Sequence, residues 1–163
     1  MQAQKIRRTL AAISVVWLAA LSTTAFAADT TPAASPVADK LTPARQLIAE
    51  GKWVAAIDAL KQVNETGNAD WNNLMGYSHR KAKTPDYPAA ERYYDEALRI
   101  DPKHRGALEY SGEMYLVLGD LPRAETRLAT LDKVCTFGCE EYTDLKKSIA
   151  AYKANGNKVV AKP

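Results

Sequence analysis

The sequence contains little of what metal, nucleophilic or redox chemistry requires. Its 163 residues include two histidines and two cysteines, and neither His79 nor His104 stands at metal-ligand spacing from Cys135 or Cys139. No G-x-S-x-G motif and no phosphate-binding glycine loop occurs. We therefore expect no catalytic residues, no metal and no cofactor, which argues against an enzyme.

A hydrophobic run of membrane-spanning length is also missing. The longest apolar stretch covers 12 residues, 10–21, whereas a bilayer helix needs about 20. This stretch follows three basic residues and precedes a small-x-small site that ends at Ala27, a pattern typical of a secretory signal peptide. We predict a signal peptide over 1–27, cleaved after Ala27, and export to the periplasm or beyond. An uncleaved anchor is the alternative, and the Arg7-Arg8 pair leaves twin-arginine export open beside general secretion.

The excess of basic residues belongs to the predicted signal peptide. Residues 1–27 carry three of the 22 Lys and Arg residues and none of the 19 Asp and Glu residues, so 19 of each remain. Nucleic acids and anionic membranes attract proteins with a basic field. The exported chain would be neutral, and we expect neither nucleic-acid binding nor stable membrane insertion after cleavage.

What the sequence does contain is a pattern repeated three times at a spacing of 34 residues. Ala56, Ala90 and Ala124 mark the period. Large apolar residues stand three positions before and four positions after each alanine: Trp53 and Leu60, Tyr87 and Tyr94, and Leu121 and Leu128. One helix face therefore recurs three times, and a fixed period of this length indicates a helix–turn–helix solenoid.

This repeat resembles the tetratricopeptide repeat (TPR) family. The third copy reads Leu108-x2-Ser111-Gly112-x2-Tyr115 and then Ala124-x3-Leu128, and the second copy supplies a closing Asp101-Pro102. Segments 104–120 and 135–145 also resemble small exported bacterial TPR proteins of unassigned role. The resemblance implies an all-α solenoid of three TPR helix–turn–helix repeats, at about 41–68, 70–102 and 103–135, plus a C-terminal capping helix.

The predicted domain covers residues 41–153, between a disordered leader at 28–40 and a flexible tail at 154–163. Its first helix should begin at Pro43 after Thr42 as N-cap, and its third should be capped by Asp70. The predicted helices are 43–50, 53–63, 70–81, 87–100, 104–118, 121–134 and the capping helix 140–152.

The two cysteines suggest a disulfide at the end of the last repeat. Export places Cys135 and Cys139 in an oxidising compartment, where thiols pair by default. In a straight helix, residues four apart have Cβ atoms about 5–6 Å apart, more than a disulfide accepts. The helix must therefore bend or end between them, and Gly138 permits this. A redox-active pair is the alternative, although a helix C-terminus opposes a thiolate.

The resemblance also implies a binding surface. In TPR proteins the first helices of the repeats line a concave groove that holds a peptide or helix of another protein. By position, this groove would contain Arg45, Ile48, Asn73, Tyr77, Arg80, Glu109 and Glu113, without the Lys/Asn clamp that captures a C-terminal carboxylate. We predict a non-enzymatic adaptor or scaffold in the bacterial cell envelope. The alternatives are a thiol–disulfide component that uses Cys135 and Cys139, a homo-oligomer, or a merely solvated face.

Overall fold

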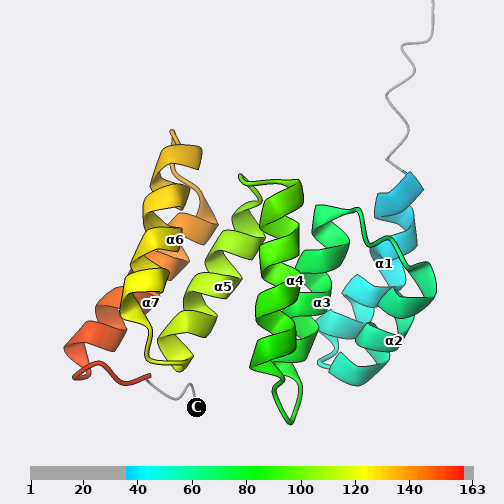
Figure 1. Ribbon diagram of the computed structural model, residues 1–163, viewed down its shortest axis with the longest axis horizontal. Helices are drawn as coiled ribbons and strands as arrows, with labels where there is room; N and C mark the ends of the chain where they lie inside the picture. The colour runs from blue at the N-terminus through cyan, green and yellow to red at the C-terminus, as the bar shows by residue number, and fades with distance from the viewer. Residues whose placement is uncertain (1–35, 160–163) are drawn as a thin grey trace, which may run out of the picture. The chain divides into compact units, whose positions relative to one another are not determined.

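The computed structural model describes residues 36–159, and throughout this range the protein is all-α, without strands (Figure 1). The helices are α1 (Pro36–Ala49), α2 (Trp53–Val63), α3 (Ala69–Lys81), α4 (Tyr87–Ile100), α5 (Arg105–Val117), α6 (Leu121–Val134) and α7 (Glu140–Ala154). The predicted signal peptide, residues 28–35 of the predicted leader and the last four residues of the predicted tail lie outside the described range.

Helices α2, α4 and α6 have the predicted bounds because short polar residues mark their ends. Asp86 and Asp120 accept hydrogen bonds from the backbone N–H groups of Ala89 and Arg123, at 2.9 and 3.1 Å. A proline in the first turn follows each of these caps. Helix α2 ends at Asn64, which adopts the left-handed conformation with φ 51°.

The first helix differs from the prediction. It begins at Pro36 instead of Pro43, and so includes residues 36–40 of the predicted leader. Pro43 then lies inside the helix, where its missing N–H removes one backbone hydrogen bond. Leu41 and Ala44, on either side of this proline, are 0 and 1 % exposed. Because Leu41 is buried, the chain ahead of Pro43 stays packed, and the helix extends to the N-terminal side of the proline. The rule that proline is disfavoured inside a helix does not predict this extension.

The cap of α3 was also predicted wrongly. Asn68, and not Asp70, accepts the backbone N–H of Trp71, at 2.9 Å. Asp70 is therefore available for bonds to other helices. Helix α5 begins one residue later than predicted because His104 is its N-cap, with the side-chain Nδ1 accepting the N–H of Ala107 at 3.0 Å.

The helices pack in consecutive pairs, α1 with α2, α3 with α4 and α5 with α6, while α7 packs against both α5 and α6. The odd-numbered helices also contact one another in order, α1 with α3, α3 with α5 and α5 with α7 (Figure 1). The odd-numbered helices therefore form a row of neighbours, and side chains from several of them can meet.

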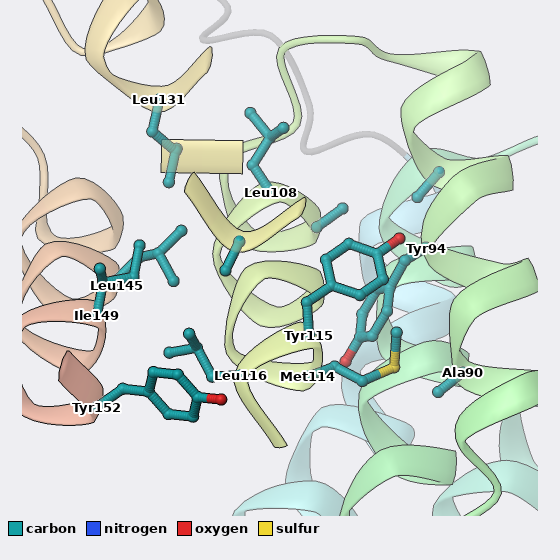
Figure 2. Close-up of a cluster of buried hydrophobic side chains, with 13 residues drawn as sticks. Ala90, Tyr94, Leu108, Met114, Tyr115, Leu116, Leu131, Leu145, Ile149 and Tyr152 are labelled. Atoms are coloured by element: carbon teal, nitrogen blue, oxygen red, sulfur yellow. The ribbon is translucent and has the colours of Figure 1, made fainter. Parts of the chain in front are cut away.

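Two apolar clusters make up the core. The first joins α1, α2 and α3 through Leu41, Ala44, Ile57, Leu60, Trp71, Leu74 and Met75. The second joins α4 to α7, with Tyr94 and Tyr115 lying between α4 and α5 and with Leu131, Leu145 and Ile149 beyond them (Figure 2). The three alanines that mark the period are all 0 % exposed, so each occupies a close contact between helices.

Between residues 36 and 159, no helix combines the length and the apolar character that crossing a membrane would require.

Candidate functional site

Three pairs of side chains connect α3 to α5, and we call these six residues the ladder. The pairs are Asp70 with His104 (Oδ1 to Nε2, 2.9 Å), Tyr77 with Tyr110 (ring centroids, 4.6 Å) and Arg80 with Glu113 (Nη2 to Oε2, 3.0 Å). The two members of each pair are 33 or 34 residues apart in the chain. The period found in the sequence therefore places matching positions of two helices in contact.

The first pair of the ladder is an exposed polar cluster. The Asp70 carboxylate lies 2.9 Å from His104 and also 2.9 Å from the guanidinium of Arg45. The hydrogen bond from His104, aided by the charge of Arg45, lowers the pKa of Asp70. Asp70 is half exposed, so water weakens these interactions and their effect on stability is small.

The second pair is the aromatic centre of the ladder. The Tyr77 ring meets Tyr110 on one side and the edge of Trp53 at 5.8 Å on the other. The Arg80 guanidinium carbon lies 5.4 and 5.7 Å from the two tyrosine ring centroids, which is cation–π geometry. Burial raises the pKa of Tyr110 to about 12, so this phenol stays neutral and able to donate a hydrogen bond near neutral pH.

Beside the third pair, α5 and α7 form an acidic cleft. The cleft has a volume of about 220 Å³ and is lined by Glu109, Tyr110, Glu140, Glu141 and Asp144. Burial, followed by repulsion from Glu113, Asp144 and Glu141, raises the pKa of Glu109 to about 8. Glu109 is therefore largely protonated at neutral pH, whereas Glu113 forms an ion pair with Arg80.

The structure assembles part of the predicted binding surface. Tyr77, Arg80 and Glu113 belong to the ladder, and Glu109 lies beside it. Arg45 reaches the ladder through Asp70. The two remaining predicted residues, Ile48 and Asn73, lie in a different environment.

Ile48 is partly buried and packs against the first apolar cluster. Asn73 is 7 % exposed, and its Oδ1 has no hydrogen-bond partner among the described residues. A Cβ added at Gly106 would come within 3.1 Å of its Nδ2, so Asn73 fills the space between α3 and α5. Both residues offer little surface to a partner.

Sequence reasoning missed Asp70, His104, Tyr110 and Trp53 as members of this surface. Two of the missed contacts carried a usable signal. Asp70 and His104 are one period apart, and Tyr77 and Tyr110 differ from a period by a single residue. Pairing polar and aromatic residues across one period would have identified both contacts.

The two cysteines form the predicted disulfide, with Cα atoms 5.5 Å apart. As predicted, the helix does not continue between them: α6 ends at Val134, and Gly138 takes the left-handed conformation with φ 83°. The Cys139 sulfur also accepts the N–H of Tyr142 at 3.4 Å and so caps α7. The bridge therefore fixes the turn between α6 and α7.

The histidines have structural contacts of their own. His79 is partly buried and stacks on the Tyr93 ring at 5.5 Å, while His104 belongs to the ladder. Among residues 36–159, no three His, Cys, Asp or Glu side chains are grouped so that they could hold a metal ion.

Comparison with protein-family models, with curated proteins and with solved structures finds no match to this chain. The function proposed below therefore rests on the chain's own residues.

Proposed function

We propose that this protein is a TPR-like α-solenoid that binds another protein through the ladder, as a non-enzymatic adaptor in the bacterial cell envelope. The ladder itself is the observation that carries the proposal. Three positions of α3, spread over ten residues, face positions 33 or 34 residues further along the chain, and their partly exposed side chains combine aromatic rings with charges of both signs.

The solenoid part of the proposal is supported by contacts between the even-numbered helices. Glu91 of α4 binds Arg123 of α6, and Asp95 of α4 binds Arg127 of α6 at 2.9 Å. The members of both ion pairs are 32 residues apart. The odd helices, and among the even helices α4 with α6, thus meet a neighbour about one period further along the chain, as in stacked helix pairs.

The protein-binding part of the proposal is supported by the composition of the ladder. Tyrosine, tryptophan and arginine are the residues most enriched at the energetic centres of protein interfaces. Tyr77, Tyr110 and Arg80 of the ladder contact one another, and Trp53 beside the ladder contacts Tyr77, so these rings are held in place before a partner arrives. A preformed surface loses less conformational entropy on binding.

The envelope location is supported by two independent features. The first 27 residues have the signal-peptide pattern, and Cys135 and Cys139 form a disulfide, which persists in oxidising compartments.

The test is a cross-linked pull-down from the periplasm of the source bacterium. The exported protein is compared with an Asp70→Ala/Tyr77→Ala variant of the ladder and with an Asp132→Ala/Tyr87→Ala control, which removes the same side-chain types away from the ladder. All three proteins should first be matched for helicity and melting temperature. We expect a partner to be recovered with the native protein and with the control, and to be lost with the ladder variant. Equal recovery by all three proteins would exclude the ladder as the contact surface.

A further inference from the structure

A second cleft lies apart from the ladder, between α4 and the turn that joins α2 to α3. Its volume is about 770 Å³, within the range of small-molecule sites. The side chains that decide its chemistry are Lys61, Trp71, Arg92, Tyr93, Glu96 and Arg99. None of them belongs to the ladder, so the inference below is independent of the proposed function.

One wall of this cleft is aromatic and rigid. The Trp71 indole N–H donates to the Leu60 carbonyl oxygen at 2.7 Å, which fixes the ring and satisfies its polar atom. Tyr93 meets the Trp71 ring edge-on at 5.9 Å and stacks on His79 at 5.5 Å. Trp71 is only 4 % exposed, so the partly buried Tyr93 supplies most of the apolar surface that a ligand can reach, with the Trp71 ring packed behind it.

The remaining charged lining is mostly cationic. Lys61 and Arg92 form no ion pair with any described residue, whereas Arg99 is held by Glu96 at 2.7 Å. The three cations and one anion leave a local excess of two positive charges. After burial and Asp86, the charges of Lys61 and Arg92 are the next influences on His79, which stacks on Tyr93, and both lower the pKa of His79.

The conformation of the turn that lines the cleft is fixed by hydrogen bonds within the turn. The Asn72 amide nitrogen donates to the carbonyl oxygens of Thr66 and Asn68 at 2.7 and 2.9 Å, so the amide shapes the turn. Gly67 also lines the mouth, and even an added Cβ there would meet no atom within 4 Å. The cleft is therefore formed before any ligand arrives and remains accessible.

We propose that this cleft binds a small ligand in which an acidic group is attached to a compact apolar body. The acidic group, a carboxylate or a phosphate, pairs with Lys61 and Arg92. The apolar body lies against Tyr93, behind which the buried Trp71 ring is packed. Both unpaired cations and the exposed part of the aromatic wall then gain partners, and charge-assisted hydrogen bonds supply most of the selectivity.

The test uses the fluorescence of Trp71 as a reporter within the cleft. The exported protein carries Trp53→Phe, which leaves Trp71 as its only tryptophan. It is titrated with phenyl phosphate, benzoate, inorganic phosphate and benzyl alcohol. We expect a saturable signal with phenyl phosphate, benzoate or both, and much weaker binding of inorganic phosphate and benzyl alcohol. The preferred aromatic acid identifies the acidic group.

A double variant and a charge-matched control locate the site. Lys61→Gln/Arg92→Gln should weaken binding by about tenfold or more, because each lost charged hydrogen bond contributes substantially. Lys147→Gln/Lys158→Gln removes two exposed charges elsewhere and should leave the affinity unchanged. Equal affinity in the two double variants would overturn the proposal, as would binding of inorganic phosphate or benzyl alcohol as tight as that of the aromatic acids. No saturation by either acid below about 10 mM would also overturn it.

Discussion

At the scale of single residues, glycine and alanine determine how closely the helices approach. An added Cβ at Gly76 would lie 2.8 Å from atoms of the Tyr94 ring and 3.1 Å from the carbonyl oxygen of Ala90. Tyr94 is itself fully buried, so its ring has no free space into which it could move. Gly76 is therefore required for a close contact between α3 and α4.

Replacing Gly76 by alanine should destabilise the protein. Overpacking at a buried contact costs about 1–3 kcal/mol. At a contact as close as this one, we expect that cost to exceed the roughly 1 kcal/mol by which alanine favours a helix over glycine. Urea unfolding measures the change. Gly67→Ala is the matched control, because a Cβ there meets no atom within 4 Å, and its stability should equal or exceed that of the native protein. A Gly76→Ala variant as stable as this control would contradict the described contact.

Glu109 should make the stability of the protein depend on pH. Its pKa is about 8 in the folded protein against an ordinary 4.5, so the folded state holds the proton more tightly than the unfolded chain. The stability contributed by this group is complete below about pH 4.5 and is lost as the pH rises toward about 8. Glu109→Gln removes this loss.

The melting temperature of Glu109→Gln relative to the native protein should therefore rise across that pH window. Asp132→Asn, which neutralises an exposed carboxylate elsewhere, controls for the change in net charge. A difference between Glu109→Gln and native protein that stays constant with pH would show that Glu109 ionises normally.

At the scale of elements, the disulfide links the end of α6 to the start of α7. It closes a loop of about five residues, and chain entropy predicts a contribution of about 2 kcal/mol. Replacing both cysteines by serine should lower the stability by about this amount and leave partner capture intact. Serine also serves well as an N-cap, so the cap that Cys139 provides to α7 is kept. Lost capture at unchanged stability would instead support thiol–disulfide chemistry as the function.

Sequence alone predicted the elements best where local signals agreed. The caps Asp86 and Asp120 and the apolar period give the bounds of α4 and α6. The start of α1 was missed because Leu41 is held by tertiary burial, which no local rule expresses. The burial of the Asn73 side chain was not predicted, for a related reason. Its register on α3 was visible in the sequence, but its distance from α5 depends on Gly106.

At the scale of the described domain, the two apolar clusters differ in size. The cluster of α1 to α3 contains seven buried residues, and that of α4 to α7 contains thirteen. Local opening of a protein is easiest where least apolar surface is buried. Native-state hydrogen exchange should therefore show lower opening free energies for the amides of α1 and α2 than for those of α5. Uniform protection would mean that the clusters unfold as one unit.

The near-constant chain separation across the ladder has a consequence for evolution and for protein engineering. Asp70 meets His104 and Arg80 meets Glu113 at separations of 34 and 33 residues, so each pair joins two different residue types that stand about one period apart. Tandem duplication of residues 70–103 would therefore place Asp70 opposite a second Asp70, and Arg80 opposite a second His79 instead of Glu113. A chain lengthened in this way would need a charge-changing substitution at each new contact, because like charges that face each other destabilise the contact.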